Sequence, residues 1–344
     1  MYRFKAYFLT LGICTAVLFG SNAPAKASDV ASFYKGKTIN LVIGGTAGGG
    51  YDLYARVFAK YFGTHIPGNP TIVPQNMPGA GNLRVTMYLY DVAPKDGTVI
   101  GTFSRSIPLA PLMGLPGAKF NATKFTWLGS AAQDSWVCFS WNESPVKTWK
   151  DLFTTDFTVG GVGKGSDPDV YATLIKNTFN TKLKLVSGYP GTGDIILAVE
   201  RHEVDGVCGY SYTTLSSTNG DWIKNKQINL IVQGGLHPDP DMPGVPFILD
   251  EATSESQKAM LRLALAPQAM ARPFVAPPGI PADRAKALQQ AFDDTMKDPG
   301  FLADAKKLDL PVDPLTGNQV EAMLTQIYKT SPTVVKQTRS IMGY

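Results

Sequence analysis

A glycine-rich loop at residues 44–52, Gly-Gly-Thr-Ala-Gly-Gly-Gly-Tyr-Asp, carries residues suited to holding an anion. It lies between an aliphatic and β-branched run, Thr38–Ile43, and a segment with apolar residues at helical spacing, 53–62. Glycines allow the backbone to approach a ligand closely. The N-terminus of the following helix adds unpaired N–H groups and a partial positive charge. The pattern therefore predicts an anion-binding loop between a buried strand and a helix.

The same residues argue against a nucleotide. A Walker A loop needs Lys-Ser or Lys-Thr after its last glycine, whereas Tyr51 follows Gly50 here. The dinucleotide fingerprint also fails, because Ala47 and Leu53 stand where glycines are required. We therefore expect a carboxylate. Asp52 either caps the first helical turn or contacts the ligand, and the cap is favoured because a buried acid repels an anion.

A second loop, residues 160–168, repeats the arrangement as Gly-Gly-Val-Gly-Lys-Gly-Ser-Asp-Pro. Asp167 as N-cap and Pro168 at the first helical position mark the start of a helix. Two such helix N-termini, one in each domain, can face each other across a cleft. Each charge-assisted hydrogen bond contributes about 1.5–3 kcal/mol. A few of them reach a micromolar Kd, which corresponds to about −8 kcal/mol.

Apolar runs alternate with helical patterns along the chain, which predicts an α/β fold. Predicted strands cover residues 38–43, 71–73, 99–103, 137–141, 158–162, 184–187, 204–208, 228–233 and 270–276. Pro273 inside the last of these predicts an edge position or a later start. Only helices follow, and we expect them to pack on the first sheet. The pattern predicts two mostly parallel sheets, which are flanked by helices and separated by a hinge and an interdomain cleft.

The N-terminus predicts export. Arg3 and Lys5 precede an apolar stretch at 6–19, and Ala25-Lys26-Ala27 fits signal peptidase, so residues 1–27 form a signal peptide cleaved after Ala27. The formal net charge of +4 falls to +1 once the three basic residues of this leader are removed. No basic cluster suggests nucleic-acid binding. We expect a periplasmic protein.

Cleavage also removes Cys14 and leaves Cys138 and Cys208, both in apolar, strand-like runs. In an oxidising compartment the hypothesis is a disulfide, with two buried free thiols as the alternative.

Catalytic signatures are absent from the sequence. Its histidines are His65, His202 and His237, with no His-Glu-x-x-His motif and no Gly-x-Ser-x-Gly elbow. The cysteines lack zinc spacing. We therefore expect no enzyme, no cofactor and no metal site.

An ordered set of segments resembles one known family, the receptors of tripartite tricarboxylate transporters, called Bug proteins. The segments are residues 39–56, 76–82 (Asn-Met-Pro-Gly-Ala-Gly-Asn), 93–98 (Ala-Pro-Lys-Asp-Gly-Thr), 163–166, and 188–193 leading into Glu203-Val204-Asp205. They span most of residues 35–280.

The resemblance implies a two-lobed type II periplasmic-binding fold that closes on a small carboxylate, di-, tri- or aromatic, and delivers it to a two-component membrane permease. We expect a monomer, with domain 1 at 28–134 and 253–344 and domain 2 at 135–252. A sensory module that presents the same ligand to a membrane kinase stays open as the alternative.

The loops and the resemblance together predict the site. Expected ligand contacts are Thr46, Gly49, Gly50, Tyr51, Asp52, Asn76, Gly79, Ala80, Ser104, Arg105, Ser106, Gly163, Lys164, Gly165, Ser166, Asp167 and Tyr189. Arg105 either clamps a second carboxylate or is an exposed arginine paired with a surface acid. Lys164 is a weaker candidate of the same kind. Asp167 and Asp169 add negative charge that disfavours a plain tricarboxylate. Tyr51, Trp136 and Tyr189 are candidates for an aromatic-accepting pocket, with core packing the favoured role of Trp136.

Overall fold

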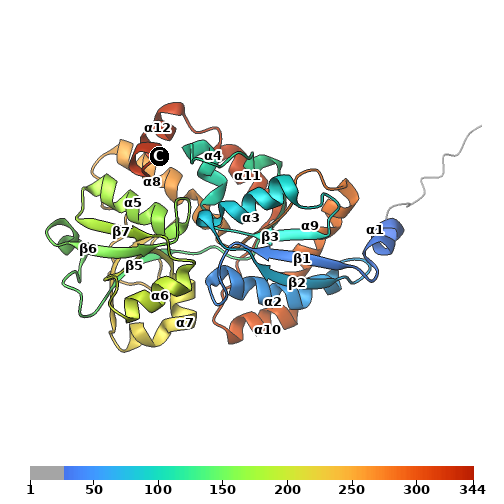
Figure 1. Ribbon diagram of the computed structural model, residues 1–344, viewed down its shortest axis with the longest axis horizontal. Helices are drawn as coiled ribbons and strands as arrows, with labels where there is room; N and C mark the ends of the chain where they lie inside the picture. The colour runs from blue at the N-terminus through green and yellow to red at the C-terminus, as the bar shows by residue number, and fades with distance from the viewer. Residues whose placement is uncertain (1–26) are drawn as a thin grey trace, which may run out of the picture.

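The computed structural model describes residues 27–344. The predicted leader and its cleavage site lie outside these residues, except for Ala27 itself. Two sheets form the framework (Figure 1). The first has the order β11-β4-β10-β3-β1-β2 and the second the order β7-β6-β8-β5-β9. We call the part built on the first sheet lobe 1 and the part built on the second lobe 2.

The strands of lobe 1 are β1 (Thr38–Ile43), β2 (Thr71–Asn76), β3 (Val99–Thr102), β4 (Thr126–Ser130), β10 (Pro273–Ala276) and β11 (Leu315–Thr316). Those of lobe 2 are β5 (Trp136–Trp141), β6 (Phe157–Gly161), β7 (Leu183–Ser187), β8 (Gly206–Ser211) and β9 (Ile228–Gly234).

The two-lobed α/β fold predicted from the sequence is confirmed, but its sheets, expected to be mostly parallel, are mixed. β1 pairs in parallel with β2 and β3, whereas β10 runs antiparallel to β3 and β4. In lobe 2, β6 is parallel to β7 and β8, and β5 is antiparallel to β8 and β9. The antiparallel strands β5 and β10 are those on which the chain crosses between lobes: it leaves lobe 1 after β4, enters lobe 2 on β5 and returns on β10. The short edge strand β11 is also antiparallel to β4. The domain boundaries at 134/135 and 252/253 stay a prediction.

The helices are α1 (Ala27–Tyr34), α2 (Gly50–His65), α3 (Leu83–Met87), α4 (Ala110–Met113), α5 (Asp167–Phe179), α6 (Thr192–Glu200), α7 (Tyr212–Lys224), α8 (Glu255–Leu265), α9 (Ala282–Thr295), α10 (Pro299–Lys307), α11 (Gly317–Ile327) and α12 (Pro332–Ile341). As expected, α9 and α11 pack on β4, and α10 packs on α2. The last helix differs, because α12 lies against α4, α5 and α8 and so reaches lobe 2 (Figure 1).

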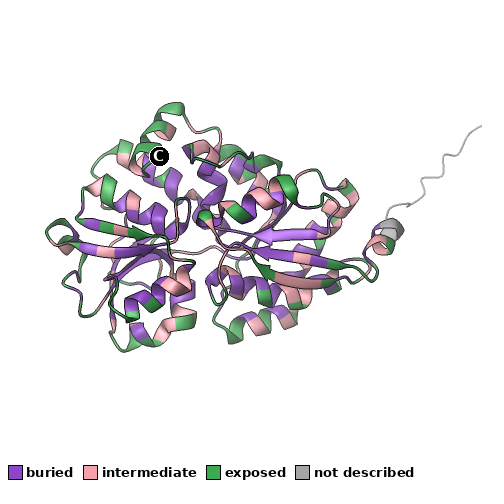
Figure 2. Cartoon of the chain, in the orientation of Figure 1, coloured by how far each residue is buried: buried purple, intermediate pink, exposed green. Residues whose placement is uncertain are grey.

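Three apolar cores hold these layers together, and the strands of both sheets are largely buried (Figure 2). One core runs through both lobes and joins Phe103 and Trp127 with Trp136 and Tyr171. The other two each belong to one lobe, around Phe58 in lobe 1 and Phe139 in lobe 2. The lobes therefore share a core on the side of α5 and α11 and have separate cores on the side of α6, α7 and α10 (Figure 1).

Two local features bear on the sequence expectations. Pro273 is the first residue of β10, an interior strand, so the later start is the correct alternative. Proline is tolerated at a strand's first residue because the missing N–H interrupts no ladder bond there. Cys138 on β5 and Cys208 on β8 are joined by a disulfide between adjacent strands, and both are fully buried.

Within residues 27–344, no helix combines the length and apolar character needed to cross a membrane.

Candidate ligand-binding site

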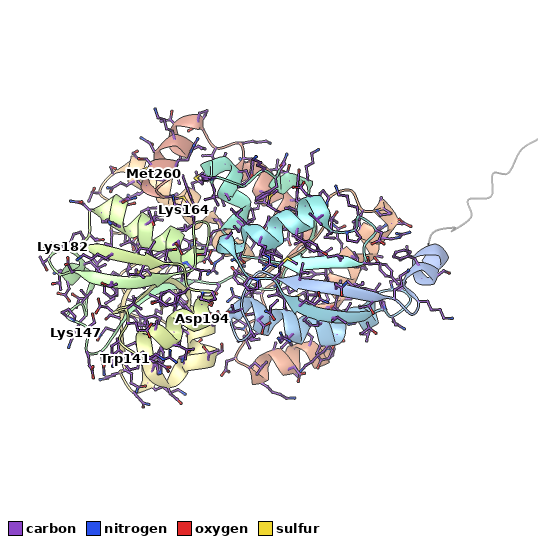
Figure 3. The ribbon with its side chains drawn as sticks, viewed as in Figure 1. Trp141, Lys147, Lys164, Lys182, Asp194 and Met260 are labelled. Atoms are coloured by element: carbon purple, nitrogen blue, oxygen red, sulfur yellow. A yellow bond between two sulfur atoms is a disulfide. The ribbon has the colours of Figure 1, made fainter. Side chains whose placement is uncertain are left out.

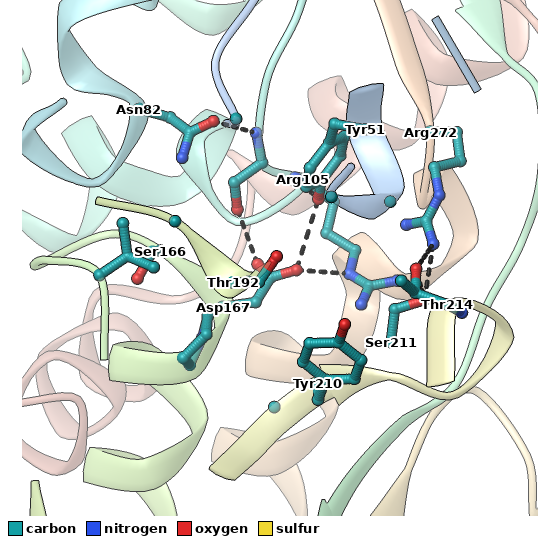
Figure 4. A pocket seen from close by; sticks show the side chains of 18 of the residues that line it. Tyr51, Asn82, Arg105, Ser166, Asp167, Thr192, Tyr210, Ser211, Thr214 and Arg272 are labelled. Atoms are coloured by element: carbon teal, nitrogen blue, oxygen red, sulfur yellow. Dashed lines mark hydrogen bonds and ion pairs between the residues drawn. The ribbon is translucent and has the colours of Figure 1, made fainter. Parts of the chain in front are cut away.

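A small cavity of about 60 Å³ lies between the lobes (Figure 4). One bound water needs roughly 10–15 Å³, so the cavity has room for about four to six waters. Its walls come from both lobes: Gly45, Gly49, Gly50, Tyr51, Asn82, Ser104, Arg105 and Arg272 on one side, and Val162, Ser166, Asp167, Pro168, Pro190, Gly191, Thr192, Gly209, Tyr210, Ser211 and Thr214 on the other. The cavity suits a ligand of a few heavy atoms.

Four helices begin at this cavity, α2 from lobe 1 and α5, α6 and α7 from lobe 2, and two of them, one from each lobe, have a glycine N-cap. α2 starts at Gly50 after the N-cap Gly49, and α6 starts at Thr192 after the N-cap Gly191. A glycine N-cap has no side chain to satisfy the N–H groups of the first turn, so these groups stay available to a ligand. Each N-terminus also carries about half a positive charge. The backbone alone thus makes the cavity attractive to an anion.

Close approach of the lobes depends on glycine at two wall positions. A Cβ added at Gly191 of lobe 2 would overlap the side chain of Thr46 in lobe 1. A Cβ at Gly50 would overlap the hydroxyl of Thr214, which lies in lobe 2. Any larger residue at either position would hold the lobes apart.

A buried ion pair crosses the cavity wall between the lobes (Figure 4). Nε of Arg105, from the loop after β3, donates to Oδ2 of Asp167 in the first turn of α5 at 2.8 Å. The hydroxyls of Ser104 and Ser106 donate to Oδ1 of the same carboxylate at 2.7 and 2.5 Å. The side chains of Arg105 and Asp167 are 1% and 8% exposed, so water screens this pair little.

A second ion pair adjoins the first at the segments that cross between lobes. Nη2 of Arg272 lies 3.0 Å from Oδ2 of Asp134, and the same oxygen is 3.4 Å from Nη1 of Arg105. Arg272 also donates to the hydroxyls of Ser211 and Thr214. Two arginines and two aspartates thus form one buried, charge-balanced cluster that links the cavity to the crossing segments.

The cluster holds Asp134 and Arg105 in their charged forms. Burial by itself would raise the pKa of Asp134, but Arg272 and Arg105 hold that pKa below its ordinary range. Burial would lower the pKa of Arg105, and the neighbouring carboxylate of Asp167 raises it above its ordinary value instead. Burial, followed by Asp167, raises the pKa of Tyr51 to about 12. At neutral pH Tyr51 is therefore a protonated phenol. Its oxygen accepts from the backbone N–H of Arg105 at 3.0 Å, and its hydroxyl donates to Oδ2 of Asp167 at 3.4 Å.

Comparison of this architecture with solved structures identifies the fold, whereas no protein-family model and no curated protein matches the sequence. The periplasmic binding protein BugD superposes with a TM-score of 0.70 at 18% identity, over 90% of this chain and 98% of BugD. The fold is that of the periplasmic binding proteins. MatC from Rhodopseudomonas palustris, with bound malate, gives 0.67 at 18% identity over 89% of this chain and 99% of MatC. A second R. palustris protein, with adipate, gives 0.68 at 15% identity over 89% and 97%.

In this periplasmic-binding fold, part of the predicted site lines the cavity. The lining residues among those predicted are Gly49, Gly50, Tyr51, Ser104, Arg105, Ser166 and Asp167. The others lie outside the lining: Thr46, Asp52, Asn76, Gly79, Ala80, Ser106, Gly163, Lys164, Gly165 and Tyr189. Lys164 is exposed in the loop before α5 (Figure 3). Ser106 contributes indirectly, through its bond to Asp167.

Asp52 stabilises the glycine loop from outside the cavity lining. Its carboxylate accepts from the Gly48 N–H, Nδ2 of Asn76 and Nε of Arg56 at 2.8–2.9 Å. Asn76 in turn donates to the Gly45 carbonyl. Burial would raise the pKa of Asp52, but these bonds, led by that of Arg56, lower it. This geometry favours the role of a helix-start residue with a paired charge over that of a ligand contact.

Two expectations need correction, and a third is confirmed. Arg105 is buried, which excludes the exposed arginine paired with a surface acid. The N-cap of α5 is Ser166, in extended conformation, and Asp167 is the first helical residue; Asp167 is pulled toward lobe 1 by Arg105 instead of capping. Trp136 belongs to the core, where it stacks on Tyr171 with ring centroids 4.7 Å apart, as its favoured role implied.

The sequence reasoning missed several wall residues, above all Arg272, Tyr210, Ser211 and Thr214. A signal for Arg272 exists, because it is a lone charge in the apolar run Ala-Met-Ala-Arg-Pro-Phe-Val-Ala at 269–276. A charge there must be paired if it is buried. For Ser211 and Thr214 no local signal exists, since they line the cavity only because α7 starts where β8 ends at the cleft.

Proposed function

We propose that this chain is an exported periplasmic receptor of the Bug family, which captures a small carboxylate between its lobes and delivers it to a tripartite membrane transporter. One observation carries the proposal: the interlobe cavity is walled by the uncapped N-termini of α2 and α6, which come from opposite lobes. Because each lobe supplies one positive helix end, an anion in the cavity holds the lobes together.

Other observations favour a carboxylate over a phosphorylated ligand. The space of about 60 Å³ is small for a nucleotide, and the glycine loops lack the phosphate-binding signatures. Two solved structures that share this fold contain malate and adipate. The ordered motifs at 39–56, 76–82 and 188–193 resemble Bug receptors. The receptor acts as a monomer and passes its ligand to a two-component permease.

Ligand binding provides the test. The mature chain, exported with its own leader, is unfolded in urea without reductant and refolded, which removes carried-over ligand and keeps the disulfide. Thermal unfolding is then measured with monocarboxylates, dicarboxylates, tricarboxylates, aromatic carboxylates, amino acids and nucleotides. A ligand at 100 times its Kd stabilises the folded state by about 2.7 kcal/mol, which raises the melting temperature by several degrees.

The expected result is a raised melting temperature with one or more carboxylates, confirmed by calorimetric titration. Stabilisation only by nucleotides, or by no compound with a carboxylate, would overturn the proposed ligand class. Transport follows as the second step: deletion of the gene must abolish uptake of the stabilising carboxylate by intact cells.

A further inference from the structure

Asp167 is bound by lobe 1 in the way a protein binds a ligand carboxylate. Its Oδ1 accepts from two serine hydroxyls, those of Ser104 and Ser106, and its Oδ2 accepts from Nε of Arg105 and the phenol of Tyr51. All four donors belong to lobe 1, whereas Asp167 belongs to lobe 2. A carboxylate has about four acceptor sites, so this set satisfies it completely. Lobe 1 therefore contains a formed carboxylate subsite, and a side chain of the same protein occupies it.

The charge balance around the cavity limits what else can enter. Arg105 and Arg272 are matched by Asp167 and Asp134, and all four are buried. A ligand carboxylate then meets the uncapped N-termini of α2 and α6, which together compensate about one negative charge. The N-terminus of α5 already carries Asp167 and Asp169 in its first turn, and that of α7 is capped by the Ser211 hydroxyl. A second carboxylate would be buried without a partner, which is costly in a protein interior.

We propose that Asp167 is a built-in carboxylate that fills the second-anion subsite of Arg105, Ser104 and Ser106, so that this receptor selects small monocarboxylates and excludes dicarboxylates. The proposal rests on the proposed function and names its ligand class. The restriction comes from this chain's own residues, because malate and adipate, both dicarboxylates, are bound in two solved structures of the same fold. The cavity of about 60 Å³ fits an acid of two to four carbons.

The test compares ligand pairs in which the dicarboxylate is the monocarboxylate carboxylated at its methyl group: acetate and malonate, propionate and succinate, lactate and malate. Kd is measured by calorimetric titration of the refolded mature protein. We expect wild type to bind at least one monocarboxylate, and its partner about 100-fold more weakly, because the second charge lacks a counter-ion.

Asp167→Ala frees Arg105 and both serines. We expect its affinity for that dicarboxylate to rise about tenfold or more, since charge-assisted hydrogen bonds form with the vacated donors. Asp167→Asn keeps the shape of the side chain and is used if the alanine variant does not fold. We expect it to raise the affinity for the dicarboxylate by about threefold, because its Nδ2 still fills part of the subsite. In Arg105→Ala/Asp167→Ala the gain must disappear.

Asp194→Asn is the charge-matched control. Asp194 lies in the first turn of α6, near the cleft but outside the cavity lining, and carries the same charge as Asp167 (Figure 3). Its removal raises affinity somewhat more for the dicarboxylate, which carries two charges, but it frees no counter-ion, so the ratio within a pair changes by about twofold or less, against about tenfold for Asp167→Ala.

The outcomes separate the two proposals. If wild type binds none of the six acids and no other carboxylate, the proposed function fails. If it binds a dicarboxylate as tightly as its partner, or if folded Asp167→Ala and Asp167→Asn both gain nothing, the role of Asp167 fails while the proposed function stands. Tighter binding of alanine than of lactate by wild type would also overturn it, since Asp167 would then face a ligand ammonium group.

Discussion

Nε of Arg105 and Oδ2 of Asp167 lie 2.8 Å apart and join the two lobes across the wall of the ligand cavity. The pair is buried, and its residues are 62 positions apart in the sequence. An ion pair in this position favours approach of the lobes before any ligand enters. It also places Asp167, which the sequence predicted as a helix-start residue, in the carboxylate subsite from which we propose that it excludes dicarboxylates.

Closure depends on the absence of a side chain at Gly191. Its φ of −165° is extended backbone that any residue adopts, so alanine there causes no backbone strain. A Cβ would, however, overlap Thr46 across the cleft. We expect Gly191→Ala to weaken ligand binding about tenfold or more, because overpacking costs about 1–3 kcal/mol, as measured by calorimetric titration.

Gly193→Ala is the matched control, two residues further along the start of α6, where a Cβ meets open space. Its Kd stays within about twofold of wild type, since nothing in the interface changes. Equal Kd values for both variants would show that the lobes close less tightly than the structure indicates.

The stability contributed by Asp52 depends on pH. Folding lowers its pKa, so this contribution is present above the unfolded value, about 3.9, and is lost as the pH falls through the lower folded value. We expect Asp52→Asn to lower the free energy of unfolding by about 1–3 kcal/mol at pH 7. The difference from wild type shrinks as the pH falls below about 3.9.

Urea unfolding at a series of pH values measures this difference. Asp221→Asn is the control, because the Asp221 side chain is 84% exposed, and its effect stays within about 0.5 kcal/mol throughout. A constant difference between wild type and Asp52→Asn down to pH 3 would mean that the charge of Asp52 contributes nothing.

The disulfide between Cys138 and Cys208 closes a loop with a sequence separation of 70. By the loop-entropy relation, its removal in Cys138→Ala/Cys208→Ala costs about 4 kcal/mol of unfolding free energy. Urea unfolding with and without dithiothreitol tests this: reductant shifts the midpoint of wild type toward that of the variant and leaves the variant unchanged. A reductant effect on the variant would trace the shift to another cause.

Lys164 contributes little to the bound state despite its place in the second glycine loop. It is exposed and does not line the cavity. Lys164→Ala is therefore expected to leave Kd within about twofold at physiological salt, where exposed charges are screened. A tenfold loss in a titration would place its ammonium group at the ligand.

The sequence was most informative where the determinants are local. The aliphatic run Thr38–Ile43 forms β1 with the expected bounds, and the glycine loops lie at the strand ends that face the cleft. The sequence patterns did not predict features that depend on tertiary packing. α7 and β4 were not predicted, because their alternation of polar and apolar residues is weak. α12 was expected on the first sheet and instead reaches lobe 2, since its partner α8 comes from the segment that returns between lobes.

By itself, the sequence determined the alternation of strands and helices and the glycine-bordered helix starts, and it favoured an anionic ligand, because each depends on residues close together in the chain. Only the tertiary structure decided which charges meet. Arg105 reads equally well as a ligand clamp or a surface residue until lobe 2 places Asp167 against it, and Arg272 reads as a strand residue until the crossing segments bring it to Asp134. Burial and distance set the strength of these ion pairs, and both arise only when the lobes pack together.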